Sequence, residues 1–228
     1  MIDWDMIEDR NREMVIPPHW RNPAEIVKAA ARSFRIDKWA NQLVHVEIMV
    51  EKDALSGVLG PVCQRLDVGL TANKGYSSSS TMYEIGRRLA EKRAFKGKSL
   101  VVFYLGDHDP SGIDMTRDVE ERLCMYASTH CIDVIRLALN MDQVEMWNPP
   151  ENPAKETDAR FAEYVQKFGE SSWELDAIEP ATLAELVERA VLEQRDEDLW
   201  NEAVAREEKM RGSLLEFAKT YDGKNGDG

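Results

Sequence analysis

The feature that most constrains the fold of this chain is the run SLVVFYLG, residues 99–106. This run is apolar without alternation, so neither of its faces is suited to contact with water. Continuous apolar runs of this length are typical of central strands in parallel sheets, which are buried on both faces. The sequence therefore predicts a buried central strand here.

Other predicted strands and helices alternate with this run, as a doubly wound or open parallel sheet requires. The segment LVHVEIMV alternates and is rich in β-branched residues, which indicates a strand. Further strands are predicted around 68–72 and over 131–140, and helices over 24–34, 53–65, 82–93, 113–128, 181–194 and 197–220. We expect Asn22 to cap the first of these helices, and the last Ser or Thr of GYSSSST to cap the helix over 82–93.

The composition is that of a water-soluble protein of the cytoplasm. With 228 residues, 43% of them hydrophobic, the chain is long enough to bury a core. No apolar run approaches the roughly 20 residues that cross a bilayer, and the acidic start is not a secretory signal. Cys63, Cys124 and Cys131 lie among apolar neighbours, so we expect buried, reduced thiols. These observations predict no membrane partner and a cytoplasmic location.

Charge is unevenly distributed along a chain whose net charge is −13. Seven basic residues and two acidic ones lie between Thr71 and Lys98, whereas residues 170–209 contain thirteen acidic and four basic residues. The basic stretch indicates either a surface for a polyanion or an ordinary solvated helix face. If this stretch binds a polyanion such as DNA, the residues that we expect to contact it are Lys74, Arg87, Arg88, Lys92 and Arg93.

The strongest candidate for chemistry is the segment GDHDPSG that directly follows the central strand. Ligand sites of open α/β sheets collect at the carboxyl ends of strands. Asp107 and Asp109 lie at such an end, and Glu51 directly follows the strand LVHVEIMV. Carboxylates that converge in this way suit a hard cation such as Mg²⁺, which keeps several waters. The alternative is that these acids only cap the helices that follow them.

Three ordered segments together resemble the Toprim domain, and more narrowly its version in the A subunit of topoisomerase VI and in meiotic break-forming transesterases. The segments are VEKDAL over 50–55, NKGYSSSST over 73–81 and DHDPSGID over 107–114. Phage and prophage proteins carry similar segments. The match covers residues 44–140 well and the rest loosely. It implies a Toprim domain over 44–140. The residue patterns themselves predict a helical lead-in over 1–43, a loop and helical extension over 141–221, and a disordered tail over 222–228.

The resemblance also implies roles for the three acids. Glu51 would act on the metal and as a general acid or base near the scissile phosphate, while Asp107 and Asp109 would bind Mg²⁺ or Mn²⁺. Lys74 would contact a phosphate, or would be an ordinary surface lysine. We interpret His108 as a packing or surface residue.

One part of the family's pattern is not matched. The topoisomerase VI A subunit attacks DNA with a tyrosine on a winged-helix domain that precedes the Toprim domain. All six tyrosines of this chain lie within or after the Toprim-like segment: Tyr76, Tyr83, Tyr104, Tyr126, Tyr164 and Tyr221. Either the winged helix is on another polypeptide, or the sequence is a truncated form, or the protein does not perform transesterification.

These residues lead to an expected function with two alternatives. We expect a Mg²⁺-dependent module that acts on DNA phosphodiesters, as a nuclease or within a split topoisomerase-VI-like assembly. Its partner would be DNA. A separate winged-helix or ATPase subunit, or a second copy of the chain, would complete the assembly. One alternative is a non-catalytic binding protein, such as a phage protein that engages a host topoisomerase or defence complex. A primase-like role is disfavoured, because the sequence has no zinc-binding cysteine cluster.

Two later segments are weaker candidates. Residues 148–160 are interpreted as a surface connection or as a loop over the metal crevice. Glu174 and Asp176 either supply outer ligands or face solvent, with Trp173 and Leu175 as the apolar anchors.

Overall fold

The computed structural model describes residues 19–72, 79–128 and 132–222, with the backbone alone described at 93–96 and at 222. The chain divides into two compact units. The first, residues 37–203, is called the α/β unit below. The second combines the residues up to 36 with those from 204 onward and is called the two-helix unit.

The centre of the α/β unit is a four-stranded, fully parallel sheet with the order β2-β1-β3-β4. Strands β1 and β3 are central and pair without a register shift, from Val44 opposite Ser99 to Val50 opposite Leu105. Both strands therefore end at the same edge of the sheet. The strands are β1 (Val44–Val50), β2 (Gly69–Ala72), β3 (Ser99–Leu105) and β4 (Ile132–Ala138).

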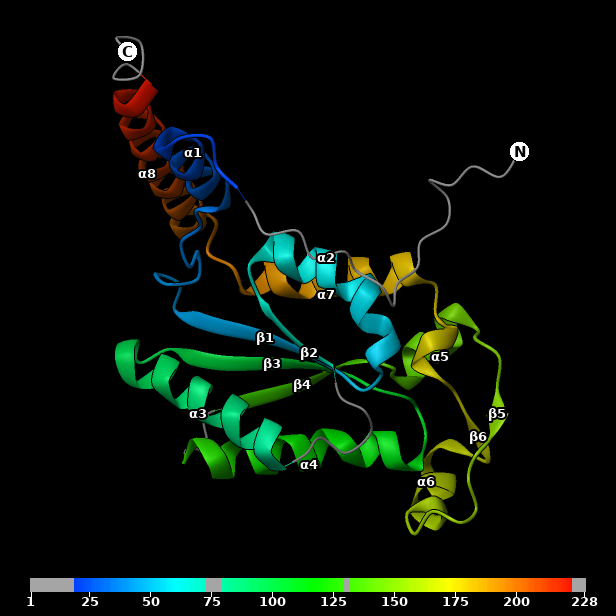
Figure 1. Cartoon of the computed structure of the whole chain (residues 1–228). Coiled ribbons are helices and arrows are strands. Elements are labelled where there is room, and N and C mark those ends of the chain that lie inside the picture. The colour runs from blue at the N-terminus through cyan, green and yellow to red at the C-terminus, as the bar shows by residue number, and fades with distance from the viewer. Residues whose placement is uncertain (1–18, 73–78, 129–131, 223–228) are drawn as a thin grey trace, which may run out of the picture. The chain divides into compact units, whose positions relative to one another are not determined.

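Helices cover both faces of this sheet, as Figure 1 shows. Helices α3 (Ser79–Lys96) and α4 (Pro110–Ala127) pack together on one face, and α2 (Ser56–Leu66) and α7 (Pro180–Gln194) pack on the other. The remaining elements of the unit are shorter. They are η2 (Asp53–Leu55), α5 (Met141–Trp147), β5 (Asn152–Pro153), α6 (Phe161–Phe168), β6 (Ser171–Ser172) and η3 (Leu175–Ala177), with β5 and β6 paired antiparallel.

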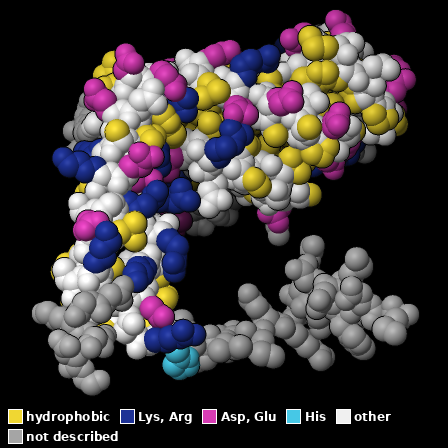
Figure 2. All heavy atoms as spheres, turned by 90° about the horizontal axis from the view of Figure 1, so that it is seen from above, with side chains coloured by type: hydrophobic (Ala, Val, Ile, Leu, Met, Phe, Trp, Pro, Cys, Tyr) yellow, Lys and Arg dark blue, Asp and Glu magenta, His cyan; other side chains and the backbone are white. Residues whose placement is uncertain are grey.

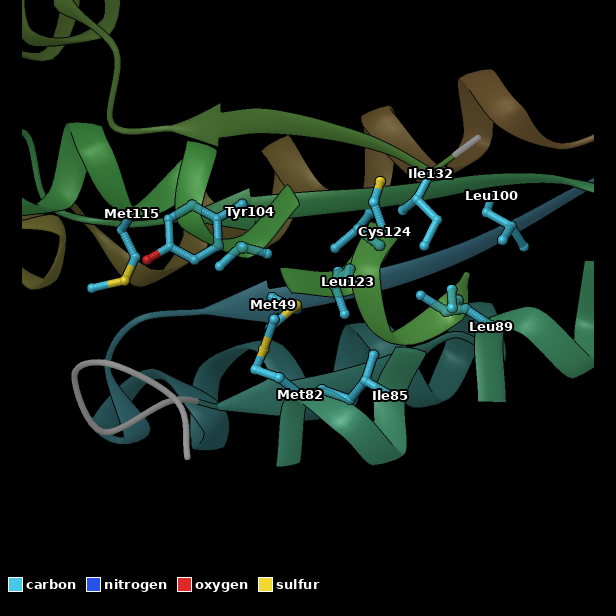
Figure 3. Close-up of a cluster of buried hydrophobic side chains, with 13 residues drawn as sticks. Met49, Met82, Ile85, Leu89, Leu100, Tyr104, Met115, Leu123, Cys124 and Ile132 are labelled. Carbon is cyan, nitrogen blue, oxygen red and sulfur yellow. The ribbon is translucent and has the colours of Figure 1, made fainter. Parts of the chain in front are cut away.

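Alternate residues of the central strands form the core beneath α3 and α4 (Figure 3). Leu100, Val102 and Tyr104 of β3 are fully buried there, and Met49 of β1 joins them. Leu123 of α4 packs into the same cluster. Burial of apolar area contributes most of the stability of such a layer, at about 25 cal/mol per Å². The sheet edge that carries the acidic residues is therefore held by a well-packed support.

The predicted α/β fold with an open parallel sheet is confirmed, and so is the helical C-terminal segment. Three details of the prediction are wrong. Helix α3 begins at Ser79, so the last Ser and Thr of the loop lie in its first turn and do not cap it. Helix α4 begins at Pro110 rather than Ile113, because Asp109 caps it and proline is well suited to the first helical position. Helices α5 and α6 were not predicted, because the prolines between them suggested a continuous loop.

The two-helix unit contains α1 (Pro23–Ser33) and the part of α8 (Glu197–Asp222) that begins at Val204. Asn22 caps α1 as predicted, since its side chain accepts a hydrogen bond from the Glu25 N–H at 3.0 Å. Glu207 is buried and accepts hydrogen bonds from the Ile36 N–H at 3.0 Å and from Arg211 at 2.8 Å. The described residues include no helix that is both long enough and apolar enough to cross a membrane.

Candidate functional site

Glu51 and Asp107 meet at the carboxyl edge of the sheet. The Glu51 N–H donates to the Leu105 carbonyl at 2.8 Å, which extends the β1–β3 pairing by one residue. The Glu51 Oε2 atom then accepts a hydrogen bond from the Asp107 N–H at 2.9 Å. The two acids that we predicted from separate strands are thus brought into direct contact.

Gly106 makes this contact possible. A Cβ atom at this position would lie 2.7 Å from Glu51 Oε2 and 2.7 Å from the Cε1 atom of Tyr104. Real Cβ atoms essentially never approach another heavy atom so closely. Any larger residue at 106 therefore has to displace either the Glu51 carboxylate or the Tyr104 ring. The glycine is required by close approach rather than by its backbone angles.

Asp107 is held by a later segment of the chain. Its Oδ1 atom accepts a hydrogen bond from the Leu175 N–H at 2.7 Å and lies 3.2 Å from Lys52 Nζ. Lys52 also pairs with Glu174 and, at 2.9 Å, with Asp176. Glu174 and Asp176, predicted as outer ligands or solvent-facing acids, are partly exposed and pair with Lys52, while Trp173 and Leu175 are buried as the predicted apolar anchors. The role of Lys52 was not predicted, because Glu174 and Asp176 lie more than a hundred residues away in the sequence.

Asp109 is the N-cap of α4. Its Oδ1 atom accepts hydrogen bonds from the Gly112 N–H at 2.6 Å and from the Ser111 hydroxyl at 3.0 Å. The capping role that we weighed against metal binding is therefore present in the structure. It occupies only one carboxylate oxygen, so capping and metal binding are compatible.

Arg136 of β4 supports the loop that carries the two aspartates. Its guanidinium donates to the carbonyls of Gly106 at 3.0 Å, Asp107 at 2.5 Å and Gly112 at 2.8 Å. Burial lowers the pKa of Arg136, and the nearby acids oppose this effect. The sequence analysis missed this residue. Its only sequence signal is a positive charge inside a predicted strand that is mostly apolar.

The acids at this edge destabilise one another's charged forms. Burial raises the pKa of Glu51, and the charge of Asp107 raises it further. Burial also raises the pKa of Asp107 and outweighs the opposing effects of the Leu175 N–H and of Lys52. The hydroxyl of Tyr104 is buried without a hydrogen-bond partner among the described residues, and burial followed by the charge of Glu51 raises its pKa. This edge is therefore short of positive charge and of hydrogen-bond partners.

The donor atoms fit a divalent cation in type, although they do not form a finished metal site. Within the described residues, no group of three His, Cys, Asp or Glu side chains converges closely enough to hold a metal ion. Glu51, Asp107 and Asp109 each use one carboxylate oxygen for hydrogen bonds. None of their other oxygens is among the buried unpaired atoms, so solvent reaches all three. Three accessible carboxylate oxygens suit Mg²⁺, which prefers oxygen ligands and retains waters.

His108 points away from these acids into an aromatic cluster, which agrees with its interpretation as a packing residue. Its ring makes edge contacts with Tyr164, Phe168 and Trp173. Its Nδ1 atom lies 2.8 Å from the Tyr164 hydroxyl, and its backbone pairs with Trp173. Burial lowers the pKa of His108 to about 4, so the ring is neutral at pH 7. The segment that covers the aspartate loop is therefore the one around 164–175. In the segment 148–160, Arg160 pairs with Asp114 of α4 at 3.0 Å.

The residues predicted to bind DNA are mostly engaged in ion pairs within the α/β unit. Arg88 donates to both carboxylate oxygens of buried Glu47, at 3.0 and 2.5 Å. Lys92 pairs with Asp37 at 2.7 Å. Arg87 is exposed, and its Nε atom lies 3.7 Å from the Oε1 atom of the equally exposed Glu91. Lys74 and the side chain of Arg93 lie outside the described residues. The described cations of α3 therefore carry less free positive charge than their number suggests. Cys63 and Cys124 are buried as expected, and Cys131 is also outside the described residues.

Comparison with known proteins identifies no relative: no protein-family model, no curated protein and no solved structure matches this chain.

Proposed function

We propose that this chain is a Toprim-type module that acts on DNA phosphodiesters with Mg²⁺ or Mn²⁺, as a nuclease or as the catalytic part of a split topoisomerase-VI-like assembly. The observation that carries the proposal is the direct contact between Glu51 and Asp107 at the ends of two central strands. Asp109 follows in the same loop, and its charge also raises the pKa of Glu51. A packed core alone does not need acids that destabilise one another.

Each residue has a part that follows from its contacts. Asp107 and Asp109 would hold the cation through the oxygens that their hydrogen bonds leave available. A divalent cation, when bound, neutralises phosphate charge and lowers the pKa of its bound water. Burial raises the pKa of Glu51 above the ordinary range of a glutamate, which suits a carboxyl that accepts and releases a proton. Arg136 fixes the backbone of the loop and so sets the direction of both aspartates.

The alternative of a non-catalytic binding module is favoured by one observation. Lys52 already provides a positive charge 3.2 Å from Asp107 and is itself held by Glu174 and Asp176. An internal ammonium group can neutralise these acids without a metal. In that case the edge would be a structural ion-pair network.

The direct test is nicking of a supercoiled plasmid by the purified chain in Mn²⁺. We expect nicking by the wild type, and loss of most of it in Glu51→Gln and in Asp109→Asn. Asparagine caps a helix as well as aspartate does, so the second variant removes the charge and keeps the cap. Glu120→Gln, an exposed carboxylate of α4, is the matched control and should keep full activity. Equal nicking in all four proteins, or none in the wild type, would favour the binding-module alternative.

A further inference from the structure

The described part of the two-helix unit is basic, although the unit as a whole is neutral and the chain is acidic. Its residues 19–36 and 204–222 contain eight Lys and Arg against five Asp and Glu, whereas residues 1–36 and 204–228 together contain eleven of each, and the full chain has a net charge of −13. One of the five acids, Glu207, is buried and bonded to Ile36 and Arg211. The surface of this described part is therefore more basic than its composition. Figure 2 shows Lys and Arg side chains gathered along it.

Four cations of this unit are exposed and make no ion pair with any described residue. Two belong to α1 or follow it, and two lie three residues apart on α8: Arg32, Arg35, Arg206 and Lys209. Residues three apart lie on the same side of a helix, so Arg206 and Lys209 form a pair of adjacent positive charges. Cations without a local counter-charge are the ones that can neutralise phosphates of a bound polyanion.

The α/β unit provides little of this attraction. Its candidate site is a group of carboxylates, which repels phosphate unless a cation is bound. Its predicted basic helix is largely neutralised, because Arg88 pairs with Glu47 and Lys92 with Asp37. A module that acts on DNA therefore needs its electrostatic attraction from another surface.

We propose that the two-helix unit holds duplex DNA through phosphate contacts from Arg32, Arg35, Arg206 and Lys209. The choice of DNA as the partner rests on the proposed function. The place of the binding surface rests on the charge and exposure of these four residues. Four phosphate contacts give a slope of roughly −3.6 in a plot of log K against log salt concentration. Contacts of this kind are independent of DNA sequence.

The test measures binding of a fluorescent 30-base-pair duplex to the full chain by anisotropy, between 25 and 200 mM NaCl, in EDTA. Arg206→Gln with Lys209→Gln should weaken binding at low salt by about tenfold or more and reduce the slope by about 2. Arg32→Gln with Arg35→Gln should act similarly. Arg65→Gln with Lys167→Gln removes two exposed cations that are paired with Glu188 and Glu163, and should change affinity by less than about threefold.

Several results would overturn this assignment. Wild-type protein that does not bind the duplex at 25 mM NaCl would contradict it, as would an equal loss in the Arg65 and Lys167 double variant. The unit also has a hollow of about 480 Å³ lined by Phe34, Met210 and Leu214. If the α8 variant dissociates a dimer in light scattering and leaves DNA binding unchanged, the surface binds a second copy of the chain instead.

Thermal melting in Mg²⁺ and the nicking assay separate this inference from the proposed function. The α8 double variant should keep the full rise in melting temperature that Mg²⁺ causes, because the carboxylates are unchanged. Salt-dependent DNA binding by a wild type that does not nick DNA would support this surface while contradicting the catalytic proposal.

Discussion

Two glutamates of strand β1 have the same chemistry and opposite surroundings. Glu47 lies in the middle of the strand, and Glu51 directly follows its last residue, Val50. Side chains four residues apart along a strand project to the same face. Burial alone would raise the pKa of Glu47, but hydrogen bonds from His45 and Arg88 outweigh it, and the pKa is lowered. At Glu51, burial and the charge of Asp107 act in the same direction, and the pKa is raised.

The opposite pKa shifts indicate that Glu47 has a purely structural role. Glu47 is 2% exposed and is neutralised by Arg88, which forms two hydrogen bonds with it. Glu51 faces Asp107, and Asp109 lies nearby. Glu47 forms hydrogen bonds with its own counter-charge, whereas Glu51 forms no hydrogen bond or ion pair with a cation that the structure describes. The two positions should therefore respond in opposite ways to neutralisation, to pH and to added cations.

The largest effects on stability are expected from variants of the ion pair between Glu47 and Arg88. Glu47→Gln weakens two hydrogen bonds from Arg88 to a buried group, which costs about 1–3 kcal/mol at pH 7, and the half-exposed Arg88 charge that it leaves unpaired is hydrated. Arg88→Gln should cost more, because it leaves the charge of the buried Glu47 carboxylate without Arg88. Urea denaturation of both variants and of the double variant measures the coupling. A Glu47→Gln protein as stable as the wild type would remove the distinction between the two glutamates.

The second effect concerns the end of the strand alone. Gly106→Ala should destabilise the chain by about 1–3 kcal/mol, because its Cβ atom forces Glu51 or Tyr104 to move. Gly212→Ala in α8 is the control, since a Cβ there meets nothing within 4 Å. Alanine in a helix interior should raise stability by about 0.5–1 kcal/mol. Thermal melting of the two variants checks both signs, and equal shifts in the same direction would contradict the close approach at Gly106.

The pH dependence should have opposite signs at the two glutamates. The lowered pKa of Glu47 gives stability that is present above the ordinary value of 4.5 and is lost as the pH falls through the folded pKa. The raised pKa of Glu51 gives stability that is present below 4.5 and is lost as the pH rises through the folded pKa. Glu47→Gln should therefore be most damaging at neutral pH. Glu51→Gln should become more favourable, relative to the wild type, as the pH rises above 4.5.

These profiles are measured by denaturation between pH 4 and 8 in EDTA, with the wild type and both variants. Two profiles that slope in the same direction would show that the surroundings of Glu47 and Glu51 do not differ as described.

The sequence could predict the sheet and the place of the acids, because these follow from local patterns. Apolar strands followed by Glu51 and by Asp107 require only that parallel strands end at one edge. It could not separate Glu47 from Glu51, because the partner of Glu47 is Arg88, 41 residues later. For the same reason it assigned Arg88 to DNA contact, although the residue forms an ion pair inside the unit.

The parts of the site that were missed depend on contacts distant in sequence. Lys52 reaches Glu174 and Asp176, and Arg136 reaches carbonyls about 25–30 residues earlier. Neither contact follows from spacing or periodicity. The capping role of Asp109 was recognised as an alternative because it is local, and it proved to be present.

The most direct test of the central claim is the effect of Mg²⁺ on thermal melting at pH 7.5. A cation that binds only the folded chain stabilises it by about 2.7 kcal/mol at a concentration one hundred times Kd. We predict a rise in melting temperature for the wild type and for Glu47→Gln, because the latter acid is not part of the cation site. Asp107→Asn should show no rise. An equal rise in Asp107→Asn, or no rise in the wild type, would contradict the claim that this edge of the sheet binds a divalent cation.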